Sequence, residues 1–262
     1  MPESSAWLKY LNPPAPPARA PGHAPHAEPG TRVPQLVCFP HSGGAASVYR
    51  PLAAAMAGDA RVVAVQYPGR QDRHGEALVT DLHELADGVA GALRAAPADV
   101  PRIFFGHSMG AILAYEVAQR LGGEGPVALI ASGRPAPSRV RLTTSYLLDD
   151  EALARQVAWL GGTAGGLLDH PEMRALLLPL IRGDYRASET YRPRGDAPLD
   201  CALVALGGDV DPVAPLEDLR AWSEHTTGPF RLEVLSGDHF YLQDNWPEIA
   251  DLVRSLALVT EH

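Results

Sequence analysis

The sequence Gly-His-Ser-Met-Gly at residues 106–110 constrains the fold of this chain more than any other feature. An apolar run at 103–105 leads into it, and a helix-forming run at 111–116 follows. A strand, a sharp turn with a serine at its apex and a helix together make a nucleophile elbow, with small residues two positions either side of the serine. Ser108 is therefore the candidate nucleophile, with the helix N-terminus directing backbone N–H groups toward it. The alternative is an ordinary tight turn, so the elbow interpretation requires a base, an orienting acid and a second oxyanion donor elsewhere.

Length and net charge indicate how many domains the chain forms and which binding functions it does not support. A chain of 262 residues suits one sizeable α/β domain. The net charge of −9 and the lack of a basic run do not support binding to nucleic acid or to an anionic membrane. No apolar signal region begins the chain and no run approaches membrane-spanning length, so we expect a soluble, cytoplasmic protein. Cys38 and Cys201 lie in apolar runs and are expected to be buried core residues.

Strand-like and helix-like segments alternate along most of the chain, which predicts an α/β fold with a mostly parallel central sheet and helices on both faces. The expected strands are 36–39, 62–65, 103–105, 127–131, 202–206 and 231–235, with helices near 47–56, 81–95, 111–116, 215–223 and 246–258. Residues 138–195 interrupt the alternation with helical patterns at 149–160 and 172–190. We interpret this segment as a helical lid inserted over the carboxyl edge of the sheet.

The N-terminal part differs in composition from the rest. Residues 1–34 are predicted to be an N-terminal segment and a Pro-rich flexible tail, and 35–262 to be the folded domain that carries the lid. Residues 1–11 contain large apolar side chains that could dock on this domain. From 12 to 34 the sequence is rich in Pro, Ala and Gly and cannot build a core.

The remaining chemistry is expected in loops that leave the carboxyl ends of strands, where open α/β sheets form their sites. His239 follows the last strand and is the candidate base. Asp209 and Asp211 both follow the 202–206 strand, and Asp238 adjoins the histidine. Spacing alone does not choose between them. We favour Asp211 as the orienting acid because it lies past the turn, and we interpret the other two as turn residues.

An oxyanion formed during attack needs two donors. The first is the backbone N–H of Met109, directly after the nucleophile. The second is expected from the loop after the first core strand, at the backbone N–H of Ser42, where two following glycines let the loop approach closely.

Taken together, these stretches resemble the type II thioesterases that accompany polyketide synthases and nonribosomal peptide synthetases, enzymes of the α/β-hydrolase superfamily. The resemblance spans nearly the whole chain, although the Pro-rich stretch at 13–31 is longer than usual. The matching pieces are Trp-Leu at 7–8, Cys-Phe-Pro-His-Ser-Gly-Gly at 38–44, Tyr-Pro-Gly-Arg at 67–70, Gly-His-Ser-Met-Gly at 106–110, Gly-Gly-x-x-Asp-Pro at 207–212 and Gly-Asp-His-Phe at 237–240.

The resemblance implies a hydrolase that removes stalled or aberrant acyl groups from the phosphopantetheine arm of an acyl or peptidyl carrier protein. It implies the triad Ser108, Asp211 and His239, with oxyanion donors at Ser42 and Met109. It calls for no metal and no organic cofactor. The partner would be the carrier protein, and a monomer is the expected state.

The sequence allows two interpretations of the residues that could contact the substrate or the partner. Arg70 and Arg73 could meet an acidic carrier protein or the phosphate of the arm, or could form a solvated or salt-bridged loop. Apolar residues of the insertion could line an acyl pocket or bury the lid; they are Leu147, Leu148, Trp159, Leu160, Leu167 and Leu168. The alternative functions are a general carboxylesterase, an offloading (type I) thioesterase and a noncatalytic hydrolase-like binding protein, which would lack a triad member.

Overall fold

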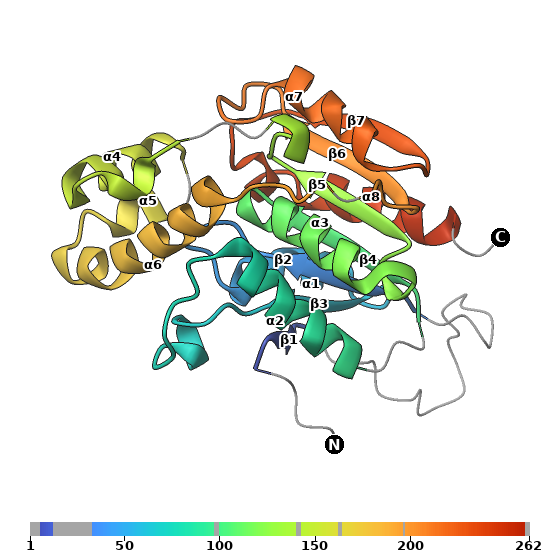
Figure 1. Cartoon of the computed structure of the whole chain (residues 1–262), viewed down its shortest axis with the longest axis horizontal. Coiled ribbons are helices and arrows are strands. Elements are labelled where there is room, and N and C mark those ends of the chain that lie inside the picture. Colours follow the sequence, from blue (N-terminus) through green and yellow to red (C-terminus); the bar gives the residue numbers. More distant parts are fainter. Residues whose placement is uncertain are drawn as a thin grey trace, which may run out of the picture.

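The computed structural model describes residues 6–12, 33–96, 100–139, 143–161, 164–195 and 197–259 (Figure 1). Most of the predicted Pro-rich tail, residues 13–32, lies outside this part of the chain. Residues 162 and 163, within the predicted lid, lie outside it as well.

The centre of the molecule is a seven-stranded sheet with the order β1-β3-β2-β4-β5-β6-β7. Neighbouring strands from β3 to β7 run parallel, and β1 pairs antiparallel with β3 at the edge. The strands are β1 (Leu8–Tyr10), β2 (Gln35–Phe39), β3 (Arg61–Val65), β4 (Arg102–His107), β5 (Ala128–Ser132), β6 (Ala202–Gly208) and β7 (Phe230–Leu235). Every residue of β2, β4 and β5 is buried, as expected for parallel strands covered on both faces.

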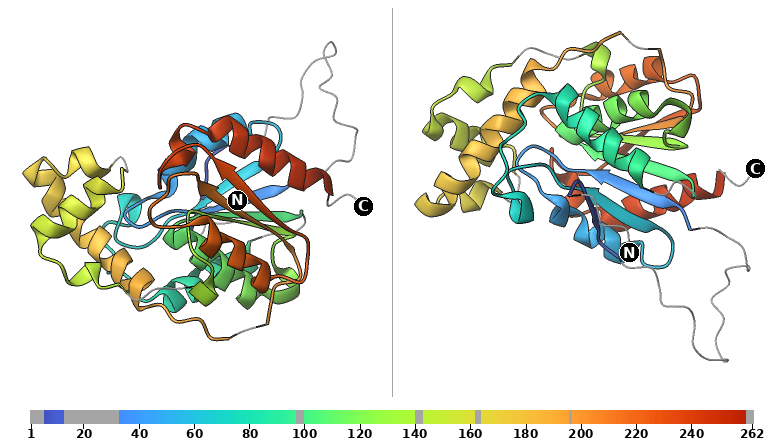
Figure 2. Two further views of the ribbon diagram at one scale, coloured as in Figure 1. Left: turned by 90° about the horizontal axis from the view of Figure 1, so that it is seen from above. Right: turned by 60° about the horizontal axis from the view of Figure 1, so that its bottom comes forward.

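Helices cover both faces of the sheet (Figure 2, left). One layer holds α2 (Leu82–Ala95), α3 (Met109–Leu121) and α7 (Leu216–Arg220), and the other holds α1 (Arg50–Ala55) and α8 (Trp246–Val259). Successive side chains of a strand point to opposite faces of the sheet, so neighbouring residues pack in different layers. Val37 and Phe39 of β2 pack in the α2–α3 layer, whereas Leu36 and Cys38 pack in the α1–α8 layer.

A helical segment lies between β5 and β6 and extends to one side of the sheet (Figure 1). It contains α4 (Asp150–Trp159), α5 (Ala164–Leu167) and α6 (Pro171–Thr190), so helices form where they were predicted at 149–160 and 172–190. The Asp149 carboxylate caps α4 by accepting from the Ala152 N–H at 2.7 Å. The segment has a small apolar core of its own, formed by Leu153, Ala154, Val157, Leu168, Leu178 and Ile181.

The N-terminal segment docks on the body as the edge strand β1. Trp7, just before it, packs so closely on α2 that a Cβ at Gly88 would lie 2.4 Å from the indole ring. Two predicted helices are shorter than expected. The one near 47–56 divides into a 3-10 turn (Ala46–Tyr49) and α1, and the one near 215–223 into α7 and a 3-10 turn (Ala221–His225). No helix of the described residues is long and apolar enough to span a membrane.

Candidate active site

Ser108 occupies the sharp turn between β4 and α3. Its backbone has φ 55° and ψ −119°, a conformation that is strained for a residue with a side chain. The turn is closed so tightly that a Cβ at Gly106 would lie 2.2 Å from the Gly110 carbonyl oxygen. A Cβ at Gly110 would lie 2.0 Å from the Phe39 carbonyl oxygen. The Ser108 N–H donates to the Ser132 carbonyl at 2.8 Å, which ties the strained turn to β5.

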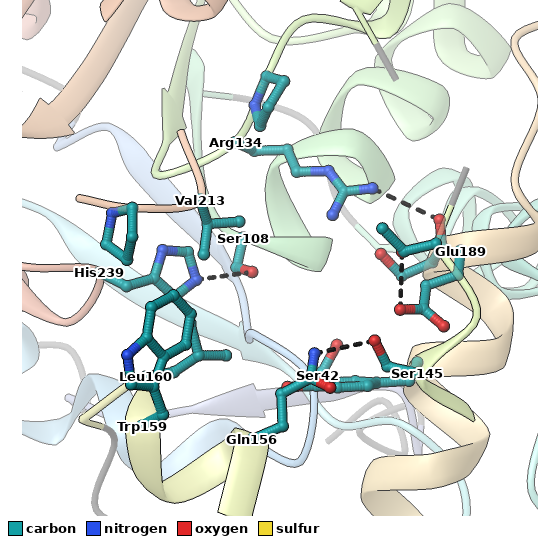
Figure 3. A pocket seen from close by; sticks show the side chains of 15 residues that line it. Ser42, Ser108, Arg134, Ser145, Gln156, Trp159, Leu160, Glu189, Val213 and His239 are labelled. Carbon is teal, nitrogen blue, oxygen red and sulfur yellow. Dashed lines mark hydrogen bonds between the residues drawn. The ribbon is translucent and has the colours of Figure 1, made fainter. Parts of the chain in front are cut away.

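His239 lies between Ser108 and Asp211. Its Nδ1 is 2.9 Å from Asp211 Oδ2, and its Nε2 is 3.1 Å from Ser108 Oγ (Figure 3). Because an ionised carboxylate only accepts, Nδ1 carries the proton and Nε2 is left to accept from the serine hydroxyl. Asp211 Oδ1 accepts from the N–H groups of Val213 at 2.8 Å and Ala214 at 3.3 Å, so the carboxylate is fixed in place.

The other two candidate aspartates contact backbone rather than the imidazole. Asp209 Oδ1 accepts from the Gly237 N–H at 2.8 Å, which links the loops after β6 and β7. Asp238 Oδ1 accepts from the Phe240 N–H at 2.8 Å, a local turn contact. Asp211 is the aspartate whose carboxylate meets His239.

The two expected oxyanion donors lie beside the serine. Met109 is the first residue of α3, and Ser42 lines the same cavity as Ser108. Neither backbone N–H has a hydrogen-bond partner within the part of the chain that the structure describes. The Ser42 loop is shaped by Gly43, whose φ of +77° favours glycine and whose Cβ would lie 2.7 Å from Ile181 Cγ1 of α6.

A buried ion pair fixes this loop from the other side. Arg70 Nη1 and Nη2 donate to Asp184 Oδ2 and Oδ1 of α6, each at 2.7 Å. Asp184 Oδ2 also accepts from the Gly43 N–H at 2.7 Å, and Arg70 Nη1 donates to the Gly44 carbonyl at 2.9 Å. We call this group the Arg70–Asp184 clamp. It joins the loop after β3, the Ser42 loop and α6.

The clamp decides between the two interpretations of Arg70 and Arg73 that the sequence left open. Arg70 and Arg73 are only 5% and 6% exposed, so they do not present a basic surface to a carrier protein. Arg73 instead forms an ion pair with Glu76 and lies over the Trp7 ring, with its guanidinium carbon 4.3 Å from the ring centroid. Both arginines therefore hold loops together, which was the alternative interpretation.

Asp184 was not predicted from the sequence. Helical spacing could have indicated that Asp184 is buried. Leu178, Ile181 and Ser188 are buried on one stripe of α6, and Asp184 lies on that stripe. A charged residue on the buried stripe of a helix needs a partner in the core. The identity of that partner is not a local property, because Arg70 is 114 residues away.

Two further histidines pack near His239. The ring centroids of His107 and His239 are 5.1 Å apart, and those of His41 and His107 are 6.0 Å apart. His107 Nδ1 is 2.9 Å from Ser132 Oγ. Burial, with a contribution from the charge of His239, lowers the pKa of His107 well below its usual range and that of His41 to about 4. Both rings are thus neutral near pH 7.

Ser108 and His239 line a cavity of about 300 Å³, which lies between the strand ends and the inserted helices (Figure 3). Of the apolar residues considered from the sequence, Trp159 and Leu160 line this cavity. Leu168 is buried in the separate core of the insertion. Leu147, Leu148 and Leu167 are exposed, and they belong neither to the residues that line this cavity nor to the core of the insertion.

A mostly parallel sheet with helices on both faces and a Ser–His–Asp array at its strand ends defines an α/β-hydrolase. The model of the thioesterase domain family matches residues 34–256, and the chain therefore belongs to that family. The predicted fold class and thioesterase activity are confirmed by this match and by the relatives that follow.

In sequence, the chain is 42% identical over 238 residues to thioesterase PikA5 of Streptomyces venezuelae, which covers 90% of this chain and 84% of that protein. It is 49% identical over 211 residues to a probable cadicidin biosynthesis thioesterase of Streptomyces griseus. That match covers 79% of this chain but 58% of the relative, less than two thirds of its length. In structure, the chain is similar to BorB, a type II thioesterase from the borrelidin biosynthetic cluster. The TM-score is 0.83 at 42% identity, covering 97% of this chain and 98% of BorB. The resemblance to the type II thioesterases is confirmed.

Proposed function

We propose that this thioesterase hydrolyses acyl groups from the phosphopantetheine arm of acyl or peptidyl carrier proteins and so clears stalled or aberrant intermediates from a polyketide or nonribosomal peptide assembly line. The observation that carries the proposal is the Ser108–His239–Asp211 array at the mouth of the 300 Å³ cavity. The similarity to BorB, over almost the full length of both chains, supports the editing role.

The proposed reaction has two halves. Ser108 Oγ attacks the thioester carbonyl carbon while His239 Nε2 takes its proton, and the oxyanion accepts from the Ser42 and Met109 N–H groups. The C–S bond then breaks, and the imidazolium returns the proton to the departing thiolate. In the second half a water molecule gives its proton to His239 and attacks the acyl–serine ester. The products are the free arm thiol and a carboxylic acid, and Ser108 regains its proton.

The other parts of the protein have matching roles in this proposal. The inserted segment, about 138–195, acts as a lid that covers the acyl group, while 35–262 forms the hydrolase domain and 1–34 its appended N-terminal segment and tail. The partner is a carrier protein, and the enzyme works in the cytoplasm as a monomer. Asp211 keeps the imidazole in the tautomer that accepts from Ser108.

The test compares release of a short acyl group from a carrier protein with cleavage of a soluble oxyester of the same acid. We expect fast release from the carrier, slow oxyester cleavage, and loss of both in Ser108→Ala. Ser255→Ala, a serine in α8 whose hydroxyl bonds the Leu252 carbonyl, is the matched control and should keep the wild-type rate.

Three outcomes would contradict the proposal. A preference for the oxyester would indicate a general carboxylesterase, and release confined to a full-length assembly-line product would indicate an offloading thioesterase. Hydrolysis that survives Ser108→Ala would remove the serine mechanism altogether.

A further inference from the structure

Arg134 is a charged residue in the cavity wall that the proposed reaction does not use. It follows β5, and its side chain lines the same cavity as Ser108 (Figure 3). Its carbonyl oxygen accepts from Trp222 Nε1 at 2.8 Å, which fixes the backbone at this point. The guanidinium has five N–H donors. Within the described residues it makes one hydrogen bond, from Nη2 to the Ser188 carbonyl at 3.4 Å, which is long for such a bond.

These unused donors point to a ligand oxygen. A guanidinium stays charged in proteins even where burial lowers its pKa, as it does for Arg134. Arg134 is partly exposed and lines the cavity, so its remaining donors are accessible to a bound substrate. An acceptor on the acyl group can bond to them in place of water, and a hydrogen bond from a charged donor is stronger than one from a neutral donor.

Several other polar side chains line the cavity as well. Glu189 accepts from Thr143 Oγ1 at 2.7 Å and from the Tyr146 N–H at 3.0 Å. Gln156 Nε2 donates to Ser145 Oγ at 2.8 Å. All of these groups except the Tyr146 N–H belong to side chains that line the cavity. An alkyl chain would cover them without forming any hydrogen bond, whereas an oxygen-bearing chain can bond to them.

The charge of Glu189 decides which kind of oxygen fits. The Glu189 carboxylate also lines the cavity, and it would repel a carboxylate on the acyl chain, which opposes binding. A neutral hydroxyl or keto oxygen can accept from Arg134, and a hydroxyl can also donate toward Glu189. We propose that the preferred substrates are short acyl groups with a neutral hydroxyl or keto oxygen beyond the thioester carbonyl, recognised by Arg134. This inference rests on the proposed thioesterase function and names its substrate class.

The test uses 3-hydroxybutyryl-pantetheine and butyryl-pantetheine, which have the same number of chain carbons. Each kcat/KM is divided by the rate of hydroxide-catalysed hydrolysis of the same compound, so that intrinsic reactivity cancels. For the wild type we expect the hydroxylated substrate to be favoured by roughly tenfold, as a hydrogen bond to a charged donor predicts. In Arg134→Met the ratio should fall to about one. A ratio measured on one sample does not depend on the fraction of folded enzyme, so partial unfolding of the variant does not affect it.

Arg139→Met is the matched control. Arg139 is an exposed arginine five residues along the chain that pairs with Glu224 outside the cavity, and its replacement should leave the ratio unchanged. Equal wild-type rates, or a preference that survives Arg134→Met, would overturn the role of Arg134 and leave the thioesterase proposal intact. Faster cleavage of malonyl-pantetheine would also overturn it, since the oxygen recognised would then be anionic. Failure to cleave any of the three thioesters would overturn both proposals.

Discussion

Asp211 and Asp184 are two buried aspartates that each pair with a basic side chain, a histidine for the first and an arginine for the second. Asp211 meets His239 at 2.9 Å, and Asp184 meets Arg70 through two contacts of 2.7 Å. Both carboxylates are almost fully shielded from solvent, and both also accept from backbone N–H groups. The difference is that a histidine can gain and lose a proton near neutral pH, whereas an arginine stays charged.

A buried carboxylate therefore serves two purposes in this molecule, one in the proposed reaction and one in stability. Asp211 lies at a strand end of the sheet, and in the proposed mechanism it stabilises the positive charge that His239 carries once it has taken the serine proton. Asp184 lies on α6 and compensates a permanent charge, which fixes the Ser42 loop against the inserted helices. Removing the charge should therefore reduce the rate in the first case and the stability in the second.

The largest expected effect is that of Asp211→Asn on the rate. The amide can donate to Nδ1 and so favours the wrong tautomer of His239, which leaves no acceptor for the Ser108 proton. We expect kcat to fall by about 10³ to 10⁴-fold. Steady-state hydrolysis of an acyl-pantetheine would measure this. Asp209→Asn is the control, because its amide oxygen can still accept from the Gly237 N–H; a loss below tenfold in Asp211→Asn would contradict the assigned role.

The next effect is that of Asp184→Asn on stability. The substitution leaves the Arg70 charge buried with its carboxylate partner gone, and breaking a buried pair in this way lowers the free energy of unfolding by about 3 kcal/mol. Urea denaturation followed by circular dichroism would measure it. Asp59→Asn, in the exposed pair with Arg254, should change stability by less than about 1 kcal/mol. If Asp184→Asn kept full stability and lost the rate as Asp211→Asn does, the distinction between the two aspartates would fail.

The smallest effect concerns His41, whose low pKa arises from burial first and then from the charges of His239 and Arg70. Its pKa is about 4 in the folded protein against 6.5 in an unfolded chain. Between these values the unfolded chain takes up the proton and the folded protein does not. Stability is therefore complete above pH 6.5 and falls as the pH drops toward 4, by at most about 3 kcal/mol from this residue, and by less because its side chain is partly exposed.

Unfolding measured at several pH values would test this. His41→Gln should flatten the slope between pH 6.5 and pH 4, and His74→Gln, an exposed histidine, should leave it unchanged. An unaltered slope in His41→Gln would show that the ring is protonated in the folded state.

Local sequence was sufficient for the parallel strands of the sheet, the elbow and the base. Alternating apolar runs indicated the order of elements, and the elbow pattern and the loop after β7 indicated Ser108 and His239. Spacing alone did not separate Asp211 from Asp209, and Asp211 was favoured for its place past the turn. In the structure the loop after β6 turns these two carboxylates toward different partners. The partner of Arg70 and the edge strand Leu8–Tyr10 depend on contacts made far along the chain, and three residues show no periodicity of their own.

The spacing of the reacting residues along the chain also has a consequence during synthesis. Ser108 precedes His239 by 131 residues, and Asp184 follows the Ser42 loop by about as many. At 5–20 residues per second a ribosome needs roughly 7 to 26 s to travel from the serine codon to that of the histidine. Throughout that interval the nascent chain carries a serine that no base can activate. The enzyme is therefore inactive during synthesis, and activity begins only when the last strand of the sheet has emerged from the ribosome and paired.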